Sequence, residues 1–511
     1  MIEKLLEITF NKEGQHRPLY QQLESSIIQL ICQGILKPGQ MLPSSRALSE
    51  SLHLNRKTVV ATYDELNAQG WVETKDRSGV YVSSQLPETS ARMADINSKK
   101  LKRNPQPGYP LITKEPFNYT TVDDQNSNII TPGTRMPLYK FDDGFPDPRI
   151  APIDQLVREY RRLGKGRLAN QFLMYGSEYG SLRLRVELAK FLNRTRGMQV
   201  TENEILITKG TQMGIYLTTQ LLIRPGDTVF VPEPGYFDAN QIFKLAGANL
   251  VFIPVDKDGM DVDRIEQLCQ QKTPKMIYII PHHHRPTTVT LSAERRMRLI
   301  NLASRYGFAL LEDDYDFDYH FTSNPLLPLA SVDTGGHIIY VGSFCKSIAP
   351  GIRIGFMIAP ETVINEAAAV RRLIDRQGEQ LLEEAMAELL IAGDISRHIK
   401  KSYKIYQGRL ENTCQLLSEH LEEYIKFDRP NGGLAIWASY RQGISASEVA
   451  KNADKLGLKI SDGSNYFFEP NTSTSNNFIR MGYCSVDETE MAHAIQIWKQ
   501  ALILSTTKRN P

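Results

Sequence analysis

Cysteine is scarce in this sequence, with five in 511 residues. They are far apart, none forms a CxxC pair, and the odd number does not suit a disulfide framework or a cysteine-based metal site. The five are Cys32, Cys269, Cys345, Cys414 and Cys484. Also missing are the ~18 consecutive apolar residues of a membrane helix and a signal-peptide pattern at the N-terminus. We therefore expect a cytoplasmic protein with reduced thiols and no membrane partner.

A strong charge of either sign is also absent. The formal net charge is +2, with 23% charged and 41% hydrophobic residues, the composition of a soluble globular protein. This balance neither requires nor excludes nucleic acid, so local clusters of charge must decide. A chain of this length exceeds one ordinary core, so we expect two or three domains.

Residues 1–83 follow the pattern of a small winged helix-turn-helix. Apolar residues recur at helical spacing over 19–31, and KPG at 37–39 ends that helix. Ser44 or Ser45 can cap a short helix, HLN forms a turn, and a further helix ends at Gly70. That further helix is predicted to bury Val59, Val60, Tyr63 and Leu66. WVETKDRSGVYV then fits a hairpin, which completes the motif.

Charge in this segment is balanced, with nine Lys/Arg and nine Asp/Glu over residues 1–85. Basic residues nevertheless fall on the predicted recognition elements and wing: Arg46, Arg56, Lys57, Lys75 and Arg77. Arg56, Lys57 and Thr58 begin the helix whose N-terminal end enters the major groove in such motifs. Charge alone does not separate a DNA-binding motif from the alternative, a solvated helical hairpin with ordinary surface charge.

Residues 84–137 have the composition of a linker, dominated by Ser, Asn, Pro and charge. The linker contains a basic cluster, Lys99, Lys100, Lys102 and Arg103. These side chains either contact DNA phosphates or form an ordinary solvated surface.

From residue 138 to about 505, short apolar strands alternate with helical stretches. The predicted strands are EILITKG (204–210), TVFVPEP (228–234), NLVFIPV (249–255), KMIYIIPH (275–282), FALLEDD (308–314) and HIIYVGS (337–343). This alternation predicts an α/β domain with a mostly parallel sheet and a ligand site at the carboxyl ends of the strands.

Several of these strands end in residues with useful chemistry. Gly210, Thr211 and Gln212 stand where a strand turns into a helix, an arrangement that can cradle a phosphate. Asp313 ends another strand within a crowded group of acids, and three histidines lie at 282–284. The acids lack the glycine and final glutamate of a calcium loop, and adjacent histidines diverge along an extended chain. We therefore expect no metal.

Lys346 follows a strand that ends at Ser343, in a place where a charged ammonium is costly. A lysine can form an imine with an aldehyde, which accounts for its presence in a dry pocket. Ser343 and Arg353 can hold a phosphate beside Thr211, and a strand-end aspartate can pair with a pyridinium nitrogen. These are the requirements of pyridoxal 5'-phosphate. The alternative is a surface lysine with its stem along the protein.

The N-terminal segment resembles the GntR family of transcription regulators. The resemblance rests on LPSSR at 42–46, RKTVV at 56–60 and GVYV at 79–82, within a match that runs almost throughout 17–82. Residues 138–505 resemble the type I aminotransferase fold, so the whole chain resembles the MocR/GabR-type transcription regulators. The resemblance implies contacts with a double-stranded DNA operator from Ser45, Arg46, Arg56, Lys57, Thr58 and Arg77.

The same resemblance gives roles to residues of the large domain. It implies that Lys346 forms the internal imine with pyridoxal phosphate. It places Asp313 on the pyridine nitrogen and Tyr315 near the phenolic oxygen, with Tyr236 of EPGYF stacked on the ring. The residues around the phosphate would be Gly210, Thr211, Gln212, Ser343 and Arg353.

Two further residues follow from the resemblance. Tyr175 in MYGSEYG matches a tyrosine that reaches the cofactor of the partner subunit in a homodimer. Arg480 in FIRMGY matches the arginine that clamps an amino acid carboxylate, to which a guanidinium binds in a bidentate manner.

The chain departs from the family pattern in three places. PHHHRPTT at 281–288 replaces a segment resembling PSHQYPTG, with Arg285 where aminotransferases place an asparagine. Asp238 stands where some GABA-sensing members have an arginine; it would repel a second carboxylate and favour an amine-bearing effector. Which of the three histidines would face the cofactor is open. These departures argue against GABA as ligand and against turnover.

Three functions are compatible with these residues. In the first, a dimeric repressor or activator senses a small amino compound that displaces Lys346 from the cofactor, which changes its affinity for DNA. In the second, the chain is an active aminotransferase with a DNA-binding appendage, which Lys346 and Asp313 permit and Arg285 disfavours. In the third, the large domain only dimerises, without cofactor. The complete set of phosphate, pyridine and lysine residues favours the first.

Overall fold

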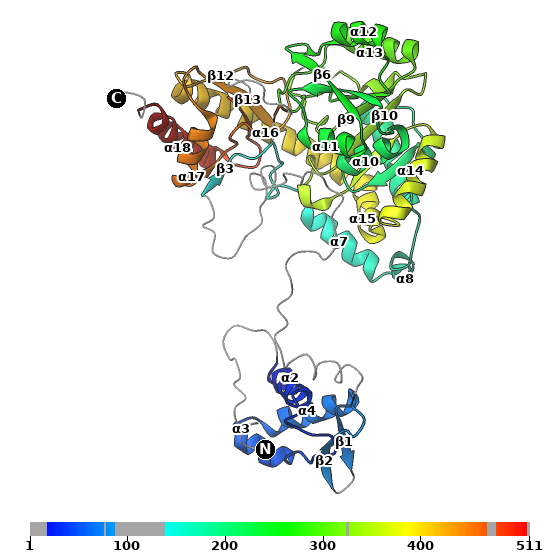
Figure 1. The fold of residues 1–511 in the computed structure, drawn as a ribbon, viewed down its shortest axis with the longest axis vertical. Coiled ribbons are helices and arrows are strands. Elements are labelled where there is room, and N and C mark those ends of the chain that lie inside the picture. The colour runs from blue at the N-terminus through cyan, green and yellow to red at the C-terminus, as the bar shows by residue number, and fades with distance from the viewer. Residues whose placement is uncertain are drawn as a thin grey trace. The chain divides into compact units, whose positions relative to one another are not determined.

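The computed structural model describes residues 18–75, 78–86, 138–322, 326–464, 466–467 and 477–507. The chain divides into two compact units, Met1–Pro116 and Phe117–Pro511 (Figure 1). The predicted boundaries at 83 and 137 stay predictions, because residues 87–137, with the basic cluster of the linker, lie outside the described residues. Arg77 lies outside them as well. Within the described ranges, no helix combines the length and apolarity needed to cross a membrane.

The smaller unit has the predicted order of helices followed by a hairpin. Its described elements are α2 (Leu19–Cys32), α3 (Ser45–Leu52), α4 (Arg56–Ala68), β1 (Val72–Lys75) and β2 (Gly79–Val82). Ser44 is the N-cap of α3, because its Oγ accepts the N–H of Ala47 at 3.2 Å. Asn55 caps α4 by accepting the N–H of Lys57 at 2.9 Å. Of the two serines considered for the first cap, the structure thus selects Ser44.

One predicted core residue of α4 is wrong. Val59, Tyr63 and Leu66 are buried on the side that packs on α2, but Val60 is 38% exposed. Consecutive helical residues are rotated by about 100° around the axis, so Val60 points away from the stripe that its neighbour occupies.

The larger unit contains an eight-stranded sheet in the order β4-β11-β10-β9-β8-β5-β6-β7. The strands are β4 (Ile205–Thr208), β5 (Thr228–Glu233), β6 (Asn249–Asp256), β7 (Gly259–Met260), β8 (Met276–Ile279), β9 (Ala309–Asp314), β10 (Ile338–Ser343) and β11 (Gly355–Ile358). The pairings from β6 through β5, β8 and β9 to β10 are parallel, whereas β7 and β11 run antiparallel to their neighbours. The prediction of a mostly parallel sheet is confirmed, and β11 is an addition to the predicted strands.

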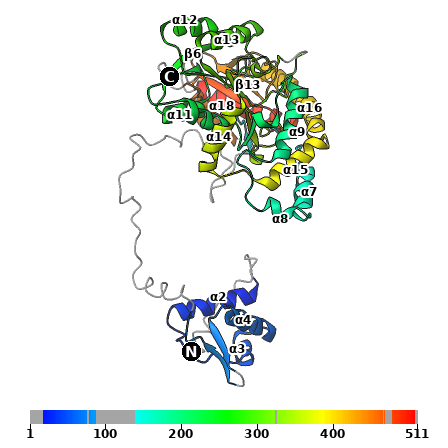
Figure 2. The ribbon, with the colours of Figure 1, turned by 90° about the vertical axis from the view of Figure 1, so that its right-hand side faces the viewer.

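Helices cover both faces of the sheet (Figure 2), and alternate residues of the strands pack against opposite layers. Val229 and Val231 pack on the side of α10, α11 and α14, whereas Phe230 packs on the side of α12 and α13. The helices are α9 (Leu182–Arg196), α10 (Thr211–Leu222), α11 (Phe237–Leu245), α12 (Val262–Gln271), α13 (Ala293–Tyr306), α14 (Glu361–Ile374) and α15 (Gln380–Ile391). Both faces are covered, which accounts for the near-continuous apolar runs of the strands. The open edge of the layers, at the carboxyl ends of the strands, is left for a site.

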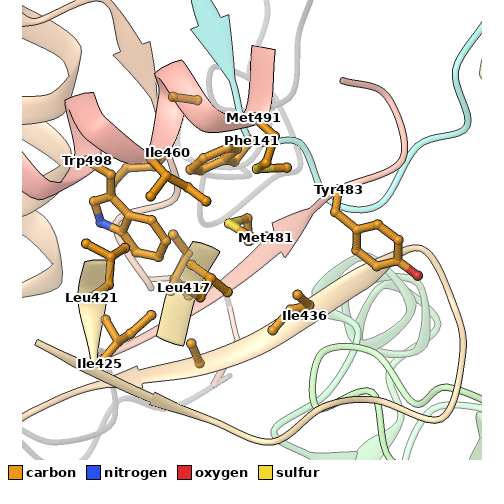
Figure 3. Close-up of a cluster of buried hydrophobic side chains, with 14 of the residues drawn as sticks. Phe141, Leu417, Leu421, Ile425, Ile436, Ile460, Met481, Tyr483, Met491 and Trp498 are labelled. Carbon is orange, nitrogen blue, oxygen red and sulfur yellow. The ribbon is translucent and has the colours of Figure 1, made fainter. Parts of the chain in front are cut away.

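The C-terminal part forms a second hydrophobic core of its own. Its elements are α16 (Asp394–Leu421), β12 (Ile425–Phe427), β13 (Ala435–Tyr440), α17 (Ala446–Lys455), β14 (Leu458–Lys459), β15 (Phe478–Gly482) and α18 (Glu488–Thr507). The segment from 138 onward joins it, since β3 (Tyr139–Lys140) pairs with β14. The remaining helices are α7 (Ile153–Gly164) and α8 (Ala169–Phe172). Figure 3 shows Phe141, Met481 and Trp498 packed together with residues of α16 in this core.

Leu417→Ala is expected to destabilise this C-terminal core by about 2–5 kcal/mol, because Leu417 is 1% exposed and its loss leaves a cavity. Two of the three tryptophans, Trp437 and Trp498, lie in this part, so urea unfolding followed by fluorescence reports on it. Leu504→Ala on α18 is the control: this side chain is 46% exposed, and its truncation should cost less than about 1 kcal/mol. Equal losses in the two variants would contradict the placement of the core.

Candidate functional site

A cavity of about 280 Å³ lies where β4, β5, β9 and β10 end. The residues that line it include Asp143, Phe145, Gly210, Thr211, Gln212, Tyr236, Asp238, Arg285, Asp313, Tyr315, Ser343, Cys345, Lys346 and Arg353. The structure thus brings together nine of the residues predicted for the large-domain site. Of the described residues predicted for it, Tyr175 and Arg480 do not line the cavity.

Lys346 projects from the loop that follows β10. Its Nζ donates a hydrogen bond to Gly144 O at 2.7 Å and lies 4.2 Å from the centre of the Phe145 ring. Burial lowers the pKa of this lysine to about 8, although the nearby Asp143 opposes the shift. A substantial neutral fraction near physiological pH is what an amine nucleophile requires.

Asp313 belongs to β9 and is 2% exposed. Its Oδ2 accepts a hydrogen bond from Tyr278 Oη at 2.8 Å, while its Oδ1 has no hydrogen-bond partner in the described part of the chain. Burial raises the pKa of this carboxyl to about 7, and the bond from Tyr278 partly offsets the rise. A buried oxygen without a partner is costly, so the site is suited to a ligand that brings a cationic N–H donor.

The opposite end of the cavity is suited to an anion. The first turn of α10 has no side-chain cap, so no side chain of the N-cap residue competes with an anion for its backbone N–H groups. Gly210 precedes it with φ 89°, and a Cβ there would lie 2.9 Å from Arg353 Nη2. A Cβ on Gly355 would come within 2.6 Å of the Gly210 Cα. Glycine at both positions lets the Arg353 guanidinium close over the helix start.

Aromatic and hydroxyl groups complete the walls. Tyr236 precedes α11, and the Arg285 guanidinium lies 4.2 Å from the centre of its ring. Tyr315 Oη donates to the carbonyl of His283 at 2.8 Å, and burial raises the pKa of this phenol far above its ordinary value. Ser343 Oγ accepts the N–H of Cys345 at 3.0 Å.

Asp143 is a site residue that the sequence did not single out. One of its oxygens, Oδ2, lies 2.6 Å from Arg285 Nη2, and the other, Oδ1, lies 3.1 Å from Arg480 Nε. Burial favours the neutral form of Asp143, but Arg285 and Arg480 outweigh it and hold the pKa below its ordinary value. Phe145 and Tyr278 were missed as well. The only sequence signal for Asp143 was the pair of acids before a glycine in FDDGF. That segment does not follow a predicted strand, so it was not placed at the site.

The crowded acids and histidines pair with each other. His282 Nδ1 lies 3.4 Å from Asp314 Oδ1, and His283 Nδ1 lies 3.0 Å from Asp316 Oδ1. Among the residues that the structure describes, no group of three such side chains is placed to hold a metal ion. Of the three histidines, His283 touches the site, through its backbone bond with Tyr315.

Tyr175 is 74% exposed, with the Arg376 guanidinium 4.0 Å from its ring centre. An exposed ring is available to a second copy of the chain, and the role of Tyr175 there stays a prediction.

The predicted DNA-contacting residues lie on the surface of the smaller unit. Arg46, Arg56 and Lys57 are exposed, and Ser45 and Thr58 are half-buried at the starts of α3 and α4. Arg46 Nε pairs with Glu50 Oε1 at 3.2 Å, with both side chains mostly exposed. Their contacts with DNA stay predictions.

Two family models match the chain. The model "Aminotransferase class I and II" matches residues 147–497, and "Bacterial regulatory proteins, gntR family" matches residues 19–82. Both matches fall within the units that the fold separates.

Relatives with both parts are similar along nearly their whole length. A probable rhizopine catabolism regulatory protein, MocR, of Rhizobium meliloti is 26% identical over 96% of this chain and 94% of its own. The HTH-type transcriptional regulator TauR of Rhodobacter capsulatus is 27% identical over 97% of this chain and 99% of its own. Among solved structures, the kynurenine aminotransferase of Pyrococcus horikoshii, in complex with PMP, is 26% identical, with a TM-score of 0.67 over 74% of this chain and 93% of its own.

The larger unit therefore has the type I aminotransferase fold, which usually forms dimers, and the smaller unit is a GntR-type domain, which implies DNA binding. The chain belongs to the aminotransferase class I and II family, and with its GntR-type domain it is a transcription regulator of the MocR/GabR type.

Proposed function

We propose that this regulator holds pyridoxal phosphate in the cavity and uses it to sense a small amino compound. The observation that carries the proposal is that Lys346, with its lowered pKa, shares the cavity with the unpartnered Oδ1 of Asp313. These two groups meet the needs of the cofactor aldehyde and of its pyridinium nitrogen.

The remaining contacts fit the same group. The start of α10 and Arg353 supply N–H donors for the phosphate, Tyr236 supplies a face for the ring, and Tyr315 a hydroxyl for the phenolic oxygen. The bound cofactor would supply an aldehyde carbon at which one amine replaces another. The phosphate residues would be Gly210, Thr211, Gln212, Ser343 and Arg353.

Lys346 is the group whose surroundings change when an effector binds. With the cofactor bound, an incoming amine would form a C–N bond to the aldehyde carbon and the C–N bond to Lys346 would break, without any net oxidation or reduction. The released lysine can return to the carbonyl of Gly144, 2.7 Å away here. Gly144 belongs to the loop before α7, so the exchange alters contacts between that loop and the loop that follows β10. Effector binding is thereby coupled to operator affinity by its preference for one of two arrangements.

The test uses full-length protein saturated with pyridoxal phosphate and an operator selected by the protein from a random duplex pool. Amines are screened for two effects, a change in the visible spectrum and a change in operator affinity. An amine that produces both supports the proposal. A colourless protein, or spectral changes that never alter operator affinity, would overturn it. Repeated transfer of amino groups to a keto acid would indicate an enzyme instead.

Arg46→Ala is expected to weaken operator binding by about tenfold. It should also reduce the slope of log affinity against log salt concentration by about 1, the effect of losing one phosphate contact. Its pair with Glu50 is exposed, so the substitution should cost little stability. Operator binding is measured by fluorescence anisotropy at several salt concentrations, and the visible spectrum should not change. Loss of cofactor colour in this variant would contradict the assignment of the two functions to two units.

A further inference from the structure

The arginine expected to clamp a ligand carboxylate already holds a carboxylate of this chain. Arg480 is 2% exposed, and its Nε lies 3.1 Å from Asp143 Oδ1. Its Nη1 donates to Pro286 O at 2.9 Å, and its Nη2 donates to Tyr315 Oη at 3.3 Å. The two Nη atoms are thus hydrogen-bonded, whereas Nε meets Asp143 as an ion pair without a hydrogen bond. Asp143 lines the cavity and Arg480 does not, so a ligand in the cavity meets the acid.

The loop that carries Asp143 is held in place from both sides. Asp142 Oδ1 accepts the N–H groups of Gly144 and Phe145, each at 2.9 Å. Its Oδ2 accepts a hydrogen bond from Ser485 Oγ at 2.5 Å. These bonds fix the turn immediately after Asp143 to the segment between β15 and α18.

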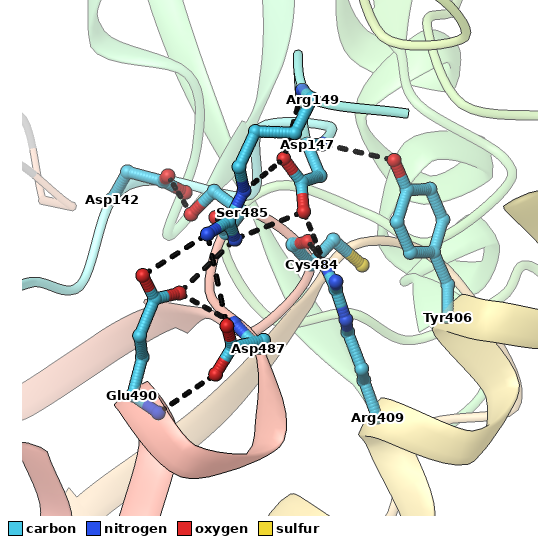
Figure 4. Close-up of polar contacts among 9 residues, drawn as sticks. All are labelled: Asp142, Asp147, Arg149, Tyr406, Arg409, Cys484, Ser485, Asp487 and Glu490. Carbon is cyan, nitrogen blue, oxygen red and sulfur yellow. Dashed lines mark hydrogen bonds and ion pairs between the residues drawn. The ribbon is translucent and has the colours of Figure 1, made fainter. Parts of the chain in front are cut away.

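A second set of contacts fixes the end of the same loop (Figure 4). Asp147 accepts from Arg149 Nε at 2.8 Å and pairs with Arg409 Nη1 of α16 at 3.0 Å. Tyr406 Oη accepts the backbone N–H of Asp147 at 2.9 Å. Because both ends are bonded to the C-terminal core, moving Asp143 away from the arginines would break several buried interactions.

The charges around the cavity are balanced without a ligand carboxylate. Arg353, Lys346 and Asp313 are taken up by the proposed cofactor. Two cations remain: Arg285, which lies near both Asp143 and Asp238, and Arg480, which pairs with Asp143. A carboxylate that entered here would be a third acid, and the described lining offers it no free cation. An amine without a carboxyl group adds no such charge.

We propose that Asp143 determines the effector class of this regulator by excluding carboxylates, and that the effector is an amine that lacks a carboxyl group. A second amino group on the effector would face the carboxylates of Asp143 and Asp238. The inference rests on the proposed function, since the amine must exchange with Lys346 on the cofactor. In this proposal Arg480 binds the carboxylate of Asp143 and not the ligand carboxylate that the resemblance implies.

Matched pairs of probes test the inference in the full-length, cofactor-saturated protein. Each pair is an amino acid and the amine left when its carboxyl group is replaced by hydrogen: L-lysine with 1,5-diaminopentane, and L-ornithine with 1,4-diaminobutane. Titrations followed by visible absorption should give half-saturation at a concentration at least about tenfold lower for the diamine of each pair. Equal or tighter binding of the amino acids, or no spectral change with any of the four, would overturn the inference.

Asp143→Asn keeps the shape of the side chain and removes its charge. The variant should lose at least about tenfold of the preference for diamines, because Arg285 and Arg480 then lack their anion and can accept a ligand carboxylate. Asp428→Asn, at an exposed aspartate, removes the same charge from the surface and should keep the wild-type preference. An unchanged preference in Asp143→Asn with cofactor colour retained would overturn the role of Asp143. If that variant loses its cofactor colour, the titrations of the wild-type protein with the paired amino acids and diamines decide the inference.

Failure of this inference is distinguishable from failure of the proposed function. Amino acids that change both the spectrum and the operator affinity more strongly than the diamines would leave a sensor in place but overturn the exclusion of carboxylates. Diamines that change the spectrum as expected without altering operator affinity would support the ligand class and overturn the sensing function.

Discussion

Lys346→Ala is expected to abolish the covalent retention of pyridoxal phosphate and the response of operator binding to amines. Lys346 is the lysine that lines the cavity, and its buried amine has a pKa lowered to about 8. Alanine removes the only primary amine that the described lining offers to the aldehyde, so an added amine has no lysine to displace. Borohydride reduction followed by peptide mass analysis should find the cofactor on the peptide that contains Lys346 in the wild type and on no peptide in the variant.

Operator binding without effector should persist in Lys346→Ala, because the DNA-binding residues lie in the other unit. The control is Lys257→Ala, at a lysine that is 90% exposed, which should retain cofactor, colour and response. Cofactor found on another lysine of the wild-type protein would contradict the site. A Lys346→Ala protein that still responds to amines would show that sensing does not need the exchange.

The sequence was enough to predict which strand-end residues come together in the site, because the end of a strand can be recognised from its immediate neighbours. The residues at the ends of β4, β9 and β10 could be placed together from the alternation of apolar runs alone, since parallel strands present their carboxyl ends at one edge. The same local logic placed the caps and turn of the smaller unit. It failed for Val60, where the spacing leaves the angular position of one residue open.

Contacts between distant segments could not be predicted in this way. Asp143 meets Arg285 and Arg480 because the loop after β3 is bonded to the C-terminal core, and no local pattern encodes that placement. Tyr278 looks like one more apolar residue of a buried strand until its hydroxyl is seen on Asp313. Arg353 adopts φ 53°, a left-handed conformation that its sequence neighbours do not require.

Asp313→Asn is expected to weaken pyridoxal phosphate binding by about 10- to 100-fold, the range for losing a charge-assisted hydrogen bond. The amide oxygen still fills the space, but it lacks the charge that would hold a pyridinium proton. Equilibrium titration with the cofactor, followed by absorption and by tryptophan fluorescence, measures the loss. Tyr278→Phe removes the 2.8 Å bond to Asp313 Oδ2 and keeps the acid, so its effect should be smaller. An affinity in Asp313→Asn equal to that of the wild type would contradict the pairing.

The same variant should change how the stability of the cofactor-free protein depends on pH. Burial raises the pKa of Asp313 from 3.8 to about 7, so the folded state keeps a proton that the unfolded chain releases. The stability that this protonated group contributes is fully present below pH 3.8 and is lost as the pH rises towards about 7. Asparagine cannot ionise, so between about pH 5 and pH 8 the variant should lose about 2–3 kcal/mol less stability than the wild type. Urea unfolding at both pH values measures this, and parallel losses in the two proteins would show that the carboxyl is already ionised, with a partner, before the cofactor binds.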